Sequence, residues 1–328
     1  MGETLAIALT NLGSPMVLFF ALGAAAALAR SDLALPEAVA KALALYLMLA
    51  IGFKGGVGVA AHGLDLGLVV TLVAGAVLSA FVPLVAFVLL SWMSSLPRVD
   101  RAAVAGHYGS ISIVTLVAAS ETVRGLGLAY EGYIVAVAAV METPAILVAL
   151  WLASRGDGRR PADEDHGGGL FREIALNGSV VVLIGAFVIG MITGEKGLAD
   201  IAPFIVDPFK GILCLFLLDM GVIAGRGLRS GYRSMTPGVI GFGLLMPLVG
   251  AAIATPVAWL AGLSAGGAAL LITLTASASY IAVPAAMRIA LPEARPAVYL
   301  TLSLGITFPF NLTLGIPLYA AIGQLLAS

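Results

Sequence analysis

The stretch AAVAGHYGSISIVTLVAA, from Ala102 to Ala119, organises the chain. Its flanks are apolar and small enough for a helix in lipid, but its centre places two glycines and two serines between Gly106 and Ser112. We expect the helix to open there. The second half of an interrupted membrane helix begins with unpaired backbone N–H groups, which form a positive end suited to a small anion. Candidate anion-binding residues are Gly109, Ser110, Ile111 and Ser112.

Composition indicates a membrane protein. Of the 328 residues, 60% are hydrophobic and 11% are charged, against about a quarter charged in soluble domains. The mean hydropathy is +1.07. The net charge of −1 gives no reason to expect a nucleic-acid partner. Cys214 is the only cysteine, which excludes an intramolecular disulfide and a cysteine-based zinc site.

Ten hydrophobic segments have roughly the twenty residues that a helix needs to cross a bilayer. They lie near 14–30, 36–57, 66–91, 101–120, 130–153, 174–193, 201–224, 237–261, 266–289 and 294–326. The sequence therefore predicts an all-α integral membrane protein. A polar linker at 154–173 separates a first five-helix unit, 1–153, from a second one, 174–328.

Lys and Arg fall mainly in the connections on the same side as this linker. Leaving aside Lys210, which lies within a span, only Lys54, Arg124 and Lys196 fall on the opposite side. The positive-inside rule then places the linker in the cytoplasm and both termini outside. The expected location is the inner membrane of a bacterial cell.

The two units also repeat. An offset of 165 residues places Ser14 on Ser179, Gly56 on Gly221, Ser112 on Ser277 and Pro144 on Pro309. Because each unit has an odd number of spans, the second enters the membrane in the opposite direction. The sequence therefore predicts a 5+5 inverted-topology repeat.

The repeat predicts a second opening within TLTASASYIAVPAAMR, in the ninth span. Serines and Pro284 interrupt that segment, since proline cannot donate to the helix ladder and hydroxyls can bond freed carbonyls or a ligand. We expect broken, crossed helices 4 and 9, with Ser277, Ala278, Ser279 and Tyr280 completing the anion site. Close helix packing by small residues is the alternative interpretation.

Glu142 is the clearest ionisable residue within a span, two positions before Pro144. A carboxylate beside a helix break suits a hard cation such as Na⁺, together with carbonyls and hydroxyls. The candidate sodium ligands are Glu142, the adjacent Thr143, Thr307 as the repeat mate of Glu142, and Asn311 one turn after Thr307. A proton-carrying Glu142, or one bonded to a neighbouring hydroxyl, stays open as an alternative. No phosphate loop, zinc-protease motif or nucleophile elbow occurs, so no enzyme and no cofactor is expected, with Na⁺ as coupling ion.

Five short strings carry a resemblance: SPMVLFF at 14–20, LAIGFKGG at 49–56, HYGS at 107–110, YEGY at 130–133 and METPA at 141–145. Over nearly the whole chain they are similar to the sodium-dependent bicarbonate transporter family of cyanobacteria and other bacteria. The resemblance implies crossed fourth and ninth spans, a homotrimer, and Na⁺-coupled bicarbonate uptake. It also implies a PII-like regulatory partner on the cytoplasmic face, although the linker is shorter here than in cyanobacterial members, and Thr143 stands where the family has serine.

Two other functions fit the same features. One is a sodium- or proton-coupled carrier of another small anion, such as a carboxylate. The other is a membrane sensor that binds an anion without moving it. The main prediction from the sequence is bicarbonate symport with Na⁺ by alternating access.

Overall fold

The computed structural model describes residues 13–62, 66–155, 178–231, 235–280, 283–284, 286–287 and 291–327, and every regular element in these ranges is helical. The elements are α2 (Pro15–Leu28), α3 (Glu37–His62), α4 (Leu66–Met93), α5 (Arg98–Gly109), α6 (Ile113–Gly125), α7 (Ile134–Val140), α8 (Glu142–Ser154), α10 (Gly178–Ile205), α11 (Phe209–Gly231), α12 (Pro237–Leu260), α13 (Ala265–Ala276), α15 (Pro296–Leu302), α16 (Phe308–Phe310) and α17 (Ile316–Ala327), with π-helical turns η2 (Ser303–Thr307) and η3 (Asn311–Gly315). Within the described part, seven helical segments are long and apolar enough to cross a membrane.

Familiar start signals fix several helix ends. Ser14 precedes Pro15 at the start of α2, and its hydroxyl accepts a hydrogen bond from the backbone N–H of Val17 at 3.4 Å. Thr236 and Pro237 begin α12 in the same way. Such caps satisfy N–H groups that have no partner within the helix.

The predicted span 201–224 is wrong at its start. Residues up to Ile205 continue α10, a turn covers 206–208, and α11 begins only at Phe209. Inside α10 the chain also bends at Gly194, whose φ of +59° places it in the left-handed region that glycine tolerates. The late start of α11 was hidden because residues 201–205, IAPFI, are apolar. The predicted linker 154–173 lies outside the described residues, except for Ser154 and Arg155.

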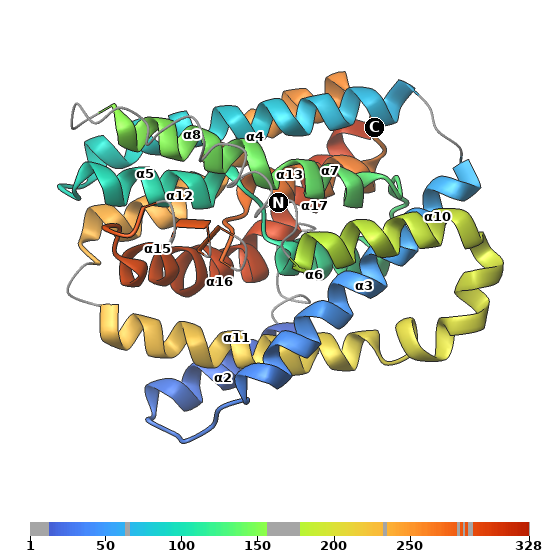
Figure 1. Ribbon diagram of the computed structural model, residues 1–328, viewed down its shortest axis with the longest axis horizontal. Helices are drawn as coiled ribbons and strands as arrows, with labels where there is room; N and C mark the ends of the chain where they lie inside the picture. Colours follow the sequence, from blue (N-terminus) through green and yellow to red (C-terminus); the bar gives the residue numbers. More distant parts are fainter. Residues whose placement is uncertain are drawn as a thin grey trace.

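Four helices, α2, α3, α10 and α11, form one layer of the molecule. Figure 1 shows α2 running along α11 at the lower edge, with α3 packed on α10. The helices cross at glycines that leave no room for a side chain. A Cβ on Gly23 would lie 2.0 Å from the Leu218 carbonyl oxygen, and one on Gly56 would lie 1.9 Å from that of Phe187. Backbone-to-backbone contact of this kind is typical of helix packing in membranes.

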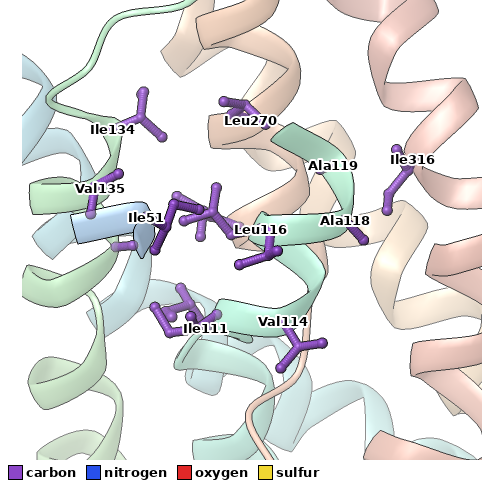
Figure 2. Packing of buried hydrophobic residues seen from close by; sticks show 14 of the residues in the cluster. Ile51, Ile111, Val114, Leu116, Ala118, Ala119, Ile134, Val135, Leu270 and Ile316 are labelled. Atoms are coloured by element: carbon purple, nitrogen blue, oxygen red, sulfur yellow. The ribbon is translucent and has the colours of Figure 1, made fainter. Parts of the chain in front are cut away.

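The remaining helices form a second body, in which α4 packs on α5, α8 and α12, and α13 packs on α17. An apolar cluster joins this body to the four-helix layer. Figure 2 shows Ile51 of α3 next to Leu116 of α6, with Ile134 of α7 and Leu270 of α13 close by. The segment from Arg98 to Gly125 is buried throughout its apolar window. The stretch that organises the sequence therefore lies at the centre of the fold.

Candidate functional site

The central stretch contains two helices rather than one. Helix α5 ends at Gly109, and Ser110 continues in an extended conformation with φ −80° and ψ 177°. Ser112 is also extended, and α6 begins at Ile113. The Ser112 hydroxyl accepts a hydrogen bond from the Thr115 N–H at 3.1 Å and so caps α6. The first N–H groups of α6 thus face the interruption without partners inside the helix.

A similar helix end lies on the other side of this point. Helix α13 ends at Ala276, and Ser277 is extended with φ −86° and ψ 171°. The Ser279 hydroxyl accepts a hydrogen bond from the Val283 N–H at 3.4 Å. Residues 281–282, between Tyr280 and Val283, are outside the described ranges.

Reciprocal hydrogen bonds join the two helix ends directly. The Ser112 N–H donates to the Ser277 hydroxyl at 2.9 Å, and the Ser279 N–H donates to the His107 carbonyl at 2.7 Å. The Ser277 hydroxyl donates in turn to the Leu274 carbonyl at 2.7 Å. Each extended segment therefore bonds to the end of the opposite helix, and Ser277 carries one of the two links.

The structural register differs from the sequence offset at this point. The offset of 165 places Ser112 on Ser277, and these two residues are bonded to each other. By backbone conformation, however, Ser110 corresponds to Ser277, because each follows the last residue of its helix. By hydroxyl hydrogen bond, Ser112 corresponds to Ser279. These pairs lie 167 residues apart, whereas Gly56 and Gly221 lie 165 residues apart. The end of α13 therefore comes two residues later than the offset of 165 predicts from the end of α5.

Two buried hydroxyls at the meeting point lack hydrogen-bond partners within the described chain: Ser110 Oγ and Tyr280 OH. Both residues are almost completely buried, at 1% and 8% exposure. The Tyr280 hydroxyl lies close enough to the Ser112 side chain to interact with it, but the two make no hydrogen bond of normal geometry. Buried polar groups are normally paired, so unpaired donors beside a positive helix end indicate a place for a small acceptor ligand. Ile111 and Ala278 are buried apolar residues that can offer only their backbone.

The predicted sodium ligands fall into two groups in the structure. Glu142 begins α8 directly after the α7–α8 turn, is 4% exposed, and has no hydrogen-bond partner for Oε2 among the described residues. Thr143 beside it is half-buried. The turn is held by Ser79 of α4, whose hydroxyl donates to the Met141 carbonyl and accepts from the Ala145 N–H.

Thr307 and Asn311, the second group, already have partners. The Thr307 hydroxyl donates to the Gly243 carbonyl at 2.7 Å and pairs with the Tyr108 hydroxyl. Asn311 donates to the Ala276 carbonyl at 2.9 Å and accepts from Tyr319 at 2.8 Å. None of these bonds involves Glu142. Thr307 and Asn311 thus stabilise the ends of α5 and α13, because they hydrogen-bond to Tyr108 and Ala276 respectively.

Ser79 and Tyr108 are contacts that sequence reasoning did not assign to the site. Their partners are a backbone carbonyl and a threonine far away in the sequence, and no local pattern marks such pairs. His107, by contrast, is fully buried, with Nδ1 2.7 Å from the Ala103 carbonyl and its ring stacked on Tyr299 at 4.4 Å. No group of three or more His, Cys, Asp or Glu side chains occurs in the described ranges. A cation at Glu142 would therefore take its other ligands from hydroxyls and carbonyls.

Seven described segments that are long and apolar enough to cross a membrane, around a buried polar centre, indicate a multi-pass helical membrane protein. The chain belongs to the Na⁺-dependent bicarbonate transporter superfamily, whose family model matches residues 15–324, nearly the whole chain. This membership confirms the family that the sequence strings predicted, which is a family of transporters. No curated protein matches the chain.

Proposed function

We propose that this protein takes up bicarbonate together with Na⁺, as a symporter that works by alternating access. One observation carries the proposal beyond family membership: two interrupted helices meet in the protein interior and leave the hydroxyls of Ser110 and Tyr280 without partners in the described chain. Bicarbonate has one negative charge and accepts several hydrogen bonds. A helix N-terminus with about half an elementary charge, together with free hydroxyl donors, suits such an ion without an arginine.

The inverted repeat is part of the proposal, and the glycine crossings support it. Gly23 faces the Leu218 carbonyl, while Gly190 faces that of Phe53. Gly56 faces the Phe187 carbonyl, while Gly221 faces that of Phe20. In each of these two pairs, one contact has its glycine in the first unit and its carbonyl in the second, and the other contact has the reverse. A pseudo-two-fold axis between the units 1–153 and 174–328 accounts for this exchange.

In this arrangement the four-helix layer of α2, α3, α10 and α11 serves as scaffold, and the body with both interrupted helices carries the anion across. The termini are outside and the membrane is the bacterial inner membrane. The homotrimer and the cytoplasmic PII-like partner stay predictions from the family resemblance.

Sodium is placed at Glu142 in this proposal, with Thr143 as the adjacent hydroxyl. Glu142 Oε2 is buried and unpartnered among the described residues, and a buried charge is expensive unless it is paired. A bound Na⁺ would pair it and, by its charge, favour the nearby anion. Since binding free energies are reciprocal, each ion should then tighten the binding of the other.

Glu142→Gln should raise the sodium concentration for half-maximal uptake by at least about tenfold, because an amide oxygen carries no charge to hold the cation. Bicarbonate affinity at saturating sodium should change much less. The measurement is initial uptake rate against sodium concentration in proteoliposomes. Glu195→Gln, at an exposed position of α10, is the matched control. Unchanged sodium dependence in Glu142→Gln would remove this residue from the sodium site.

The function itself is tested by uptake of radiolabelled bicarbonate into proteoliposomes with and without a sodium gradient. Symport predicts accumulation that requires the inward gradient and that collapses when the gradient is dissipated. Stronger competition by a carboxylate than by unlabelled bicarbonate would favour the carrier of another anion. Saturable binding with no movement into sealed vesicles would favour the sensor.

A further inference from the structure

A cavity of about 430 Å³ lies between the four-helix layer and the second body, away from the meeting point of the interrupted helices. It is lined by residues of α3, α6 and α7, by the connection before α7, and by the kinked end of α10 and the start of α11. Charged side chains in its lining are Lys54, Glu121 and Arg124. Of the helices that meet here, α6 is the one that Ser112 caps at its N-terminus. Glu121 lies nine residues further along it, or about 14 Å at 1.5 Å per residue.

The Glu121 carboxylate lies within ion-pair distance of two cations at this cavity. Glu121 is 3% exposed at its side chain, with Oε1 2.7 Å from Arg124 Nη1 and Oε2 3.3 Å from Lys210 Nζ. Arg124 also donates to the Tyr130 hydroxyl at 3.0 Å. A buried carboxylate normally needs one cationic partner. Here Arg124 is hydrogen-bonded to Oε1, and Lys210, whose side chain is 74% exposed, lies within ion-pair distance of Oε2 without a hydrogen bond to it. The group thus carries an excess positive charge before Lys54 is counted.

Lys54 is the third cation, and it has no carboxylate within salt-bridge distance among the described residues. Its ammonium lies 4.1 Å from the centre of the Phe209 ring, which leaves ammonium protons free on the other side. The lining residues Lys54, Glu121 and Arg124 therefore leave one positive charge unneutralised in a half-enclosed space with mostly apolar walls, and Lys210, 74% exposed and outside the lining, adds a second charge nearby. Such a cleft focuses the electric field and raises the local concentration of anions.

We propose that this cavity is a second anion-binding site, centred on Lys54, which takes a small monovalent oxyanion before it reaches the interrupted helices. The inference rests on the proposed function for the identity of that anion as bicarbonate. Lys54 and Arg124 belong to the few cations on the face predicted to be outside, so the site would collect the anion from the external medium. The Lys210–Glu121 ion pair joins α11 to α6, and thereby the scaffold to the body that moves.

The test measures the local potential by cysteine labelling. In a Cys214→Ser background, Val206→Cys places one thiol in the cavity lining, at a position 40% exposed. Rates of modification by a sulfonate and by a trimethylammonium methanethiosulfonate are then compared, because their ratio cancels the thiol's own reactivity. Leu260→Cys, 74% exposed at the end of α12 and outside the lining, is the reference thiol.

The expected result is an anionic-to-cationic rate ratio at Val206→Cys at least about fivefold above that at Leu260→Cys. Lys54→Gln should abolish most of that excess, Lys54→Arg should keep it, and Lys196→Gln should leave it unchanged. Bicarbonate should also slow labelling at Val206→Cys relative to gluconate at equal ionic strength. Equal ratios at the two thiols, or no effect of Lys54→Gln, would overturn the proposal even if the protein transports bicarbonate. A raised ratio with bicarbonate protection but no uptake would instead leave this site standing and refute the proposed transport.

Discussion

Gly190→Ala is expected to disrupt the packing of α10 on α3 and to lower the thermal unfolding midpoint by many degrees. A Cβ at this position would lie 2.2 Å from the Phe53 carbonyl oxygen and 2.9 Å from its carbonyl carbon. These are backbone atoms, so the neighbour cannot move aside by changing a rotamer, and the two helices must separate. Overpacking of a well-packed core costs typically about 1–3 kcal/mol, and a backbone clash should fall at or above the top of that range.

Gly185→Ala provides the matched control in the same helix, since a Cβ there would meet no atom within 4 Å. Alanine is the better helix former by up to about 1 kcal/mol, so Gly185→Ala should leave the unfolding midpoint unchanged or raise it slightly. Both variants are compared by intrinsic fluorescence during heating and by size-exclusion profile in detergent. Equal behaviour of the two variants would mean that α10 and α3 do not cross as closely as the structure has them.

These crossings show what a sequence can and cannot predict about the fold. Apolar helices follow from runs of apolar residues, and within the described residues seven segments, against ten predicted spans, are long and apolar enough to cross a bilayer. Residue identity alone was enough to pair Gly56 with Gly221. The physical reason for a glycine at each position is the close approach of a carbonyl from a partner helix, that of Phe187 or Phe20, and no local sequence pattern reveals such a contact. The late start of α11 at Phe209 was missed because Ile201 to Ile205 are as apolar on average as a helix interior.

The candidate site, too, was only partly predictable from the sequence. The small and hydroxyl residues between Gly106 and Ser112 predicted an interruption because they supply little apolar side chain and can bond freed backbone groups, and the structure has α5 end at Gly109. Which hydroxyls are free to bind a ligand depends on partners distant in the sequence. Thr307 and Asn311 resembled sodium ligands by residue type, yet their oxygens bond to protein groups.

This distinction between occupied and free hydroxyls leads to the largest effect that we expect on binding. Ser277→Ala should weaken bicarbonate binding by about 30-fold or more, since it removes the acceptor for the Ser112 N–H and the donor to the Leu274 carbonyl. The Leu274 carbonyl still accepts from the Ser277 backbone N–H at 3.2 Å, so the Ser112 N–H is the buried group left without its partner. Such a group costs roughly 1–3 kcal/mol, and about 1.4 kcal/mol corresponds to a factor of ten. Because the lost bonds join α6 to the end of α13, thermal stability should fall as well.

Ser110→Ala should give a different combination of effects at the corresponding helix end. The Ser110 hydroxyl has no hydrogen-bond partner in the described part of the chain, so its removal breaks no hydrogen bond there. Bicarbonate binding should weaken by about tenfold, the value of one hydrogen bond to a charged ligand, while the unfolding midpoint stays unchanged. Both variants are measured by bicarbonate titration and thermal unfolding of the same purified samples. If Ser110→Ala bound bicarbonate normally, the anion would not lie at the ends of the interrupted helices, because that hydroxyl is buried there and has no hydrogen-bond partner among the described residues.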